Sequence, residues 1–259
     1  MRRFGEADFE QLENEIEFCL QNIAHPACKI AEAGRFYEEA AEALRAHGIL
    51  RLLVDADSLG FSNDLVMSGH ARRAFLIRCR REGFSDYFEA LSRSGSLFDA
   101  LAANDLALAS EIVSLSPNQW KTADEYEEDF CYYRFLGLLV SNAPSTDQHD
   151  LLARFESSAR GGSARLAVCR ALQVRQKDRF EDAFAELLRV REEENEEDSP
   201  LAEEQVAIAL GTKVFVEGIG VLKLARHLGI SIADEYPMCP TLALIPGPPA
   251  TPADEFASP

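Results

Sequence analysis

A chain of 259 residues with 47% hydrophobic residues is long enough to bury a substantial core, and this composition argues against global disorder. Its 44 acidic and 26 basic residues give a net charge of −18, which disfavours direct nucleic-acid binding because such binding depends on cations that neutralise phosphates. No apolar run approaches the roughly 20 residues that span a bilayer, and no apolar segment follows the N-terminal arginines as in a secretory signal. We therefore expect a folded cytoplasmic protein with no membrane contact.

The N-terminal segment predicts a pair of helices. Apolar residues recur every three or four positions over residues 9–23 and again over 30–44, the spacing that places them on one helical face. His25-Pro26 and His47-Gly48 follow these stretches and predict where the two helices end. We expect an antiparallel helical hairpin within residues 1–64.

Residues 55–63, DADSLGFSN, begin like a calcium-binding loop. Leu59 stands at the fifth position and Val66 at the twelfth, where such loops carry oxygen ligands. We therefore predict a polar loop without a metal. Downstream, helical spacing predicts further helices over 71–81, 84–91, 97–103 and 106–115.

The stretch from Trp120 to Val140 joins a helix-start signal to an acidic cluster and an aromatic stripe. Thr122 and Glu125 have the spacing of a capping box, which predicts a helix that begins near Ala123. Its apolar stripe is formed by Tyr126, Phe130, Tyr133, Gly137 and Val140. We assign structural roles to six residues of this stretch: Trp120, Tyr126 and Phe130 in packing, Thr122 and Glu125 at the helix start, and Arg134 in an ion pair with a nearby carboxylate.

The second half repeats the helical pattern after a polar loop at 141–148. Helices are predicted over 151–158, 164–176, 180–194, 200–210 and 214–228. Strict two-residue alternation never persists long enough to predict a sheet, so we expect an all-α fold, an irregular stack of antiparallel helical hairpins. We place one helical domain at 1–245, with the hairpin at 1–64 and a helical body at 65–245, and a flexible proline-rich tail at 246–259.

Signatures of metals, cofactors and catalysis are missing from the sequence. The six cysteines lie far apart without a Cys-x-x-Cys pair, so we expect reduced, buried thiols. The five histidines fall at no zinc-ligand spacing. The run Gly218-Ile219-Gly220 lacks the third glycine of a dinucleotide site and favours helix packing. We predict no metal, no cofactor, no catalytic residue and no enzymatic activity.

Charge is distributed unevenly along the chain. Acidic residues dominate in 1–64, 99–150 and 192–259, whereas 65–98 and 151–191 have a basic excess. A basic partner protein would be attracted to such a chain, although acidity for solubility alone explains the charge equally well.

Four segments, in order along the chain, carry a resemblance to a known family. They are SLFDALAANDLALASEIVSLSP at 96–117, Trp120 with EYEEDFCYYRFL at 125–136, RFEDAFAELLR at 179–189, and VEGIGVLKLARHLGISI followed by YPMCPTLAL within 216–244. From about residue 71 to 245, this order of features resembles the immunity protein 49 family of bacterial polymorphic toxin systems. The resemblance implies an antitoxin that binds a cognate toxin domain and occludes its active site or the access of its substrate, which protects the producing cell and its kin.

An acidic helical antitoxin would suit a basic toxin that acts on nucleic acid, because its carboxylates and tyrosines could fill a basic cleft. We predict two groups of toxin-contacting residues: Asp124, Glu127, Glu128 and Tyr132 at the acidic helix start, and Glu192, Glu193, Glu194, Glu196 and Glu197 in a second acidic run. A solvated helix end is the alternative interpretation of the second run.

Two other functions stay open at this point. A helical adaptor or chaperone could bind a partner protein, or a peptide in a groove, and an uncharacterised helical enzyme could lack any familiar motif. The sequence does not predict the oligomeric state, because nothing separates a core-facing helix stripe from a dimer-forming one.

Overall fold

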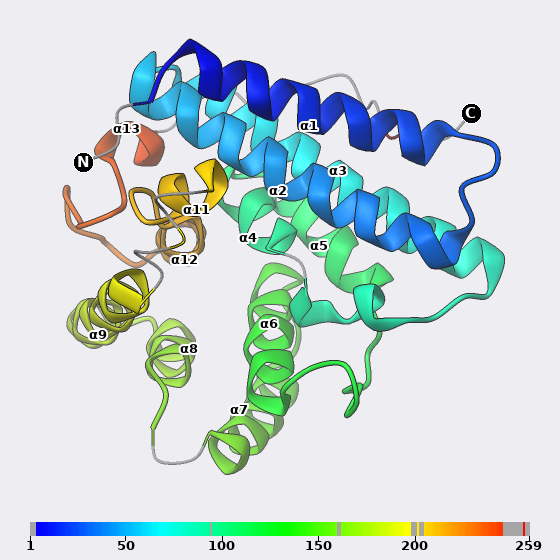
Figure 1. Ribbon diagram of the computed structural model, residues 1–259. Coiled ribbons are helices and arrows are strands. Elements are labelled where there is room, and N and C mark those ends of the chain that lie inside the picture. The colour runs from blue at the N-terminus through cyan, green and yellow to red at the C-terminus, as the bar shows by residue number, and fades with distance from the viewer. Residues whose placement is uncertain are drawn as a thin grey trace.

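The computed structural model describes residues 4–93, 95–159, 162–197, 201, 205–245 and 256, and these residues form an all-α fold without a strand, as the sequence predicts. The α-helices are α1 (Glu6–Ala24), α2 (Ile30–Val54), α3 (Ser58–Glu82), α4 (Ser96–Ala102), α5 (Leu106–Leu115), α6 (Glu127–Val140), α7 (Ser145–Ser158), α8 (Ala164–Val174), α9 (Lys177–Glu197), α11 (Val206–Gly211), α12 (Val216–His227) and α13 (Thr241–Leu244). Helices α1 to α3 run side by side along one side of the molecule, α4 and α5 come next, and α6 to α9 form the opposite side (Figure 1).

Helix α2 passes straight through His47-Gly48, where the sequence predicts a helix end. The His47 side chain is buried, and its Nδ1 lies 2.8 Å from Oδ2 of Asp64 on α3. A Cβ on Gly48 would lie 3.1 Å from the carbonyl oxygen of Phe61, so the missing side chain lets α3 approach closely. The pair therefore marks a contact between α2 and α3, and tertiary packing overrides the local stop signal.

The predicted polar loop at 55–63 is mostly helix. Asp57 caps α3, because its carboxylate accepts a hydrogen bond from the Gly60 amide at 2.8 Å. Helix α3 then continues to Gly83, which ends it in the left-handed conformation with φ of 64°. Of the two aspartates of the calcium-like motif, Asp55 thus ends α2 and Asp57 begins α3.

The helix predicted at 84–91 is absent, and two short 3₁₀ helices, η1 (Tyr87–Glu89) and η2 (Leu91–Arg93), take its place. The buried guanidinium of Arg72 donates to the carbonyl oxygens of Phe88, Glu89 and Ala90. A side chain from α3 thus satisfies main-chain acceptors that a longer helix would satisfy internally.

In the second half, α7 begins at Ser145, six residues before the predicted start at 151, and α9 extends to Glu197. The predicted helix start at 200 and the proline-rich tail lie outside the described residues, except for Phe256. That ring is buried, with its centroid 6.2 Å from the ring of Tyr37. Residue 64, the predicted end of the N-terminal hairpin, lies inside α3.

The close packing of α12 against α4 joins the C-terminal part of the chain to its middle. A Cβ on Gly220 would lie 3.1 Å from both the Phe98 carbonyl oxygen and the Leu101 Cβ. Nearby, Lys223 Nζ donates to the carbonyl oxygen of Ala102, the last residue of α4. A cation at the negative end of a helix dipole is favourable, but burial lowers the pKa of this ammonium to about 8.

All six cysteines are free thiols, and five of them are buried. Burial raises the pKa of Cys19 and Cys131 to about 11 and that of Cys79 and Cys239 to about 12. They act as small core side chains. No helix among the described residues combines the length and the apolarity needed to cross a bilayer.

Candidate partner-binding site

The acidic stretch before α6 folds differently from the capping-box prediction. Helix α6 begins at Glu127, with Tyr126 as its N-cap residue, instead of near Ala123. The buried Glu125 carboxylate accepts hydrogen bonds from the Ser92 hydroxyl at 2.7 Å and the Lys121 amide at 3.3 Å. Because Glu125 serves the η2 segment, it does not return to the Thr122 amide, and residues 122–125 form a turn.

Tyr126 and Tyr132 each have the opposite solvent exposure from the one that the sequence predicts. Tyr126 lies outside the helix and is 77% exposed, so the packing role assigned to it is wrong. Tyr132 is 0% exposed, and its hydroxyl donates to Glu217 at 3.0 Å, so it offers no surface to a partner. Phe130 is buried, and Trp120 is half-buried with its Nε1 donating to the Glu125 carbonyl oxygen at 2.9 Å.

The carboxylates at the start of α6 differ in how far they are neutralised. Glu127 pairs with Arg154 at 2.7 Å, and Asp124 lies 3.9 Å from Lys121. Glu128 is exposed and has no hydrogen-bond or ion-pair partner among the described residues. Glu128 and Tyr126 are therefore the side chains here that are freest to contact another molecule.

Arg134, the predicted partner of a nearby carboxylate, bonds the main chain instead. Its Nη1 donates to the Val113 carbonyl oxygen at 3.3 Å, and burial lowers the pKa of its guanidinium. It thus links α6 to α5.

The second acidic run occupies the exposed end of α9. Glu193 pairs with Arg189, and Glu194 lies 3.1 Å from Arg191. The remaining members are exposed and have no partner among the described residues: Glu192, Glu196 and Glu197.

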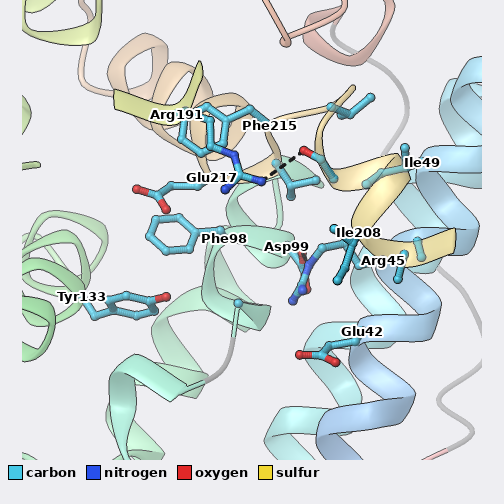
Figure 2. Close-up of a pocket in the computed structure, with 16 residues that line it drawn as sticks. Glu42, Arg45, Ile49, Phe98, Asp99, Tyr133, Arg191, Ile208, Phe215 and Glu217 are labelled. Atoms are coloured by element: carbon cyan, nitrogen blue, oxygen red, sulfur yellow. Dashed lines mark hydrogen bonds and ion pairs between the residues drawn. The ribbon is translucent and has the colours of Figure 1, made fainter. Parts of the chain in front are cut away.

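A cavity of about 360 Å³ lies between α2, α4, α6, α11 and α12 and is also lined by Arg191 of α9 (Figure 2). Its wall is part apolar and part charged. The apolar part includes Ile49, Phe98, Ile208 and Phe215, and the polar part consists of Glu42, Arg45, Asp99, Tyr133, Arg191 and Glu217.

Most charges in the cavity wall are paired. Arg45 donates two hydrogen bonds, of 2.6 and 2.7 Å, to the carboxylate of the fully buried Asp99. The Ser68 hydroxyl donates to the same carboxylate at 2.5 Å. A bidentate arginine pair of this kind compensates a buried charge only when its remaining bonds are also satisfied, as Ser68 helps to do here.

Two arginines connect the cavity to the acidic segments on the surface. Arg165 of α8 binds both oxygens of Glu217, at 3.0 and 2.8 Å, and also binds Asp129 in the first turn of α6 at 3.0 Å. Arg191 binds Glu194 in the run at the end of α9. Through these arginines, Asp129 and Glu194 are connected to the cavity wall, whereas Asp124, Glu127 and Glu128 do not line the cavity.

Two carboxylates on α2 stand out electrostatically. Burial and the neighbouring Glu42 raise the pKa of Glu38 to about 7. Glu42 itself is exposed; desolvation raises the pKa of its carboxyl, and the positive charge of Arg45 opposes this rise. Burial raises the pKa of Tyr133 as well, so its hydroxyl stays protonated and can donate. The sequence prediction missed the whole cavity; the one available signal was Asp99 inside the apolar run SLFDALA.

The fold and this site define an all-α protein with two acidic surface segments and a small, partly charged cavity. Among the described residues, no group of three or more histidine, cysteine or acidic side chains could hold a metal ion.

The model of the family described as immunity protein 49 matches residues 26–242, so the chain belongs to that family. This confirms the resemblance found in the sequence. Membership implies an immunity protein that binds a toxin partner, and it suggests a non-enzymatic role. No curated protein and no solved structure matches the chain significantly.

Proposed function

We propose that this chain is a cytoplasmic antitoxin that binds the toxic domain of a cognate polymorphic toxin and occludes its active site or the access of its substrate. The observation that carries the proposal is the family match over residues 26–242. An all-helical body with carboxylates on its surface suits steric neutralisation, which requires complementary contact and no chemistry.

The docking surface we propose is the start of α6, centred on Tyr126 and Glu128. An exposed tyrosine supplies a large contact area at low entropic cost, and tyrosines are enriched among the residues that dominate binding energy. Glu128, two residues after Tyr126, has no ion-pair partner among the described residues, whereas Glu127 between them pairs with Arg154. The surface therefore favours a partner with a basic patch, as a toxin that acts on nucleic acid would have.

The exposed end of α9 is the second part of the proposed surface. Its unpaired glutamates are exposed and add negative charge to the surface at this end of the helix. Long-range attraction of this kind speeds encounter more than it strengthens the final complex.

Co-expression tests the proposal. The chain is produced in bacteria together with the C-terminal domain of the secreted protein encoded beside it, and survival and co-purification are scored. Rescue of growth with a stable complex is the expected result. A toxic domain that the chain neither binds nor neutralises would contradict the proposal, and capture of several unrelated proteins would favour the adaptor function instead.

A further inference from the structure

The C-terminal part of the chain places one aromatic side chain against the N-terminal helices. Phe256 is only 6% exposed, and its ring centroid lies 6.2 Å from that of Tyr37 on α2. The Tyr37 ring in turn lies 5.7 Å from the ring of Phe75 on α3. We call this buried pair, Tyr37 and Phe75, the aromatic site. Phe256 is the only large apolar residue in the sequence from 246 to 259, so its burial makes it an anchor for that stretch.

Two arginines of α3 surround the aromatic site with positive charge. Burial raises the pKa of the Tyr37 hydroxyl, and the charges of Arg78 and Arg81 oppose this rise, so both cations lie within electrostatic reach of the site. They share one carboxylate, Glu82, whose Oε1 lies 2.8 Å from Arg78 Nε and 3.8 Å from Arg81 Nη2. The two guanidinium groups therefore carry one positive charge more than their shared carboxylate neutralises.

The sequence next to the anchor carries the complementary charge. Asp254 and Glu255 directly precede Phe256, and residues 246–259 contain no lysine or arginine. Consecutive Cα atoms are about 3.8 Å apart, so the main chain of both acidic residues must stay within about 8 Å of that of Phe256. Carboxylates near incompletely neutralised guanidinium groups are electrostatically favourable, most of all at low salt.

The chain between α13 and Phe256 is long enough to reach the aromatic site within one molecule. Helix α13 packs against α3 and lies at the end of the molecule where α2 leads into α3 (Figure 1). Tyr37 precedes Val54, the last residue of α2, by 17 residues, which is roughly 26 Å along the helix. The 11 steps from Ile245 to Phe256 span at most about 40 Å. The family match ends at residue 242, so the anchor lies outside the part of the chain that the family shares.

We propose that residues 246–259 act as a strap, an acidic peptide with one aromatic anchor that binds reversibly to the aromatic site of its own molecule. Phe256 supplies the buried contact, and Arg78 and Arg81 attract the two acidic residues before it. The strap ties the C-terminal end of the helical body to α2 and α3. This inference is independent of the proposed function, because α6 lies on the opposite side of the molecule from α2 and α3 (Figure 1).

The first test uses the full-length chain with ¹³C-labelled tyrosine rings, in which Tyr37→Phe identifies the Tyr37 signal. Loss of the neighbouring ring in Phe256→Ala should shift this signal, while the matched control Ser258→Ala should leave it in place. The free peptide of residues 246–259 is then added to the Phe256→Ala protein. We expect it to return the Tyr37 signal to the wild-type position, and the same peptide with Phe256→Ala to have no effect. An unshifted signal, or a shift that the peptide does not reverse, would overturn the strap.

The second test measures the contribution of charge. The Kd of the free peptide for the Phe256→Ala protein should rise at least fivefold between low and high salt, and at least threefold when Arg81→Gln is added. Arg81 is exposed, so this change leaves the core intact. Arg179→Gln, at an exposed position of α9, is the matched control and should leave the Kd unchanged. A Kd that depends on neither salt nor Arg81 would overturn the attraction between the arginines and the acidic residues.

Sedimentation of the wild-type protein identifies the molecule that supplies the strap. A monomer at every concentration, with the Tyr37 signal in its wild-type position, supports binding within one molecule. A dimer that Phe256→Ala dissociates would overturn the inference, because the peptide would then bind the aromatic site of a second copy.

Discussion

The carboxylate of Asp99 lies in the core, where Arg45 and Ser68 bind it. It has no access to water. Removing one partner of a buried pair leaves the other charge uncompensated, which costs far more than the pair itself contributes.

We predict that Asp99→Asn lowers the free energy of unfolding by about 3–5 kcal/mol, the usual cost of breaking a buried ion pair. Urea denaturation measures the loss. The exposed substitution Glu32→Gln should change stability by less than about 0.5 kcal/mol. An Asp99→Asn protein as stable as the wild type would show that the Arg45 charge finds another partner.

Lys223 gives stability a pH dependence of predictable sign. Its folded-state pKa is about 8, against an ordinary value of 10.5. Between these two pH values the unfolded chain binds more protons than the folded one, so this residue makes stability rise with pH. Below pH 8 the residue is charged in both states, and the cost of burying the charge is fully present.

We predict that Lys223→Met removes this rise. The stability of the variant relative to the wild type should fall by about 2–3 kcal/mol between pH 7 and pH 10, since one pKa unit corresponds to about 1.4 kcal/mol. Urea titrations of both proteins in reducing buffer measure the difference, and the comparison cancels the thiols and tyrosines that also titrate there. A difference independent of pH would contradict the prediction.

At the scale of elements, the first turn of α6 contains exposed residues that can be changed without disturbing the core. Glu128 and Tyr126 have few contacts to lose, while Tyr132 and Phe130, a few residues on, belong to the core. Substitutions at the first pair can therefore test the docking surface with the fold intact.

We predict that Tyr126→Ala and the double charge reversal of Glu127 and Glu128 to lysine each weaken toxin binding at least tenfold. Thermal stability should fall by less than about 1 kcal/mol, because only the exposed pair with Arg154 is lost. Titration calorimetry with the toxin domain measures binding, and Glu10→Lys on the exposed face of α1 is the matched charge control. Unchanged protection of cells by these variants would remove the start of α6 from the docking surface.

The close contact between α4 and α12 requires a glycine at position 220, because a side chain there would meet α4. We predict that Gly220→Ala lowers the free energy of unfolding by about 1–3 kcal/mol, because main-chain atoms of α4 cannot give way to the added Cβ. Gly211→Ala, whose Cβ would meet only Arg191 Nη2 at 3.8 Å, should be neutral or slightly stabilising. Equal stability of the two variants would contradict the close approach.

The sequence could predict where most helices exist but not where they end. Periodic apolar residues predict that a helix exists, because a helix in a globular protein buries one apolar face. Helix ends depend on partners elsewhere in the chain: Gly48 lies inside α2 because α3 packs on it, and α6 starts late because Glu125 binds Ser92. Neither partner can be recognised from local spacing.

At the scale of the whole molecule, the net charge of −18 sets how a partner approaches. We predict that the association rate with the toxin domain falls at least tenfold between about 0.01 and 0.5 M salt, since the Debye length shrinks from about 30 Å to a few ångströms. The dissociation rate should change much less. Stopped-flow mixing across this range measures both rates, and a salt-independent association rate would count against a basic toxin.

The candidate site was harder to predict than the fold because it is assembled from distant positions. Glu42, Asp99, Tyr133 and Glu217 meet only through the packing of four helices, and single-sequence periodicity says nothing about which helices meet. The acidic segments were visible because their residues are adjacent in the chain. The ion pairs that connect Asp129 and Glu194 to the cavity wall through Arg165 and Arg191 could not be predicted from local spacing.

The burial of the cysteines should restrict thiol reagents to one site on the folded protein. Cys28, in the loop between α1 and α2, is the one partly exposed thiol, while the other five are buried. A maleimide dye at neutral pH should therefore label the folded chain at one position and the unfolded chain at all six. The immunity protein thus carries its own attachment point for a fluorophore, and the rate at which the remaining thiols become reactive reports how often the fold opens.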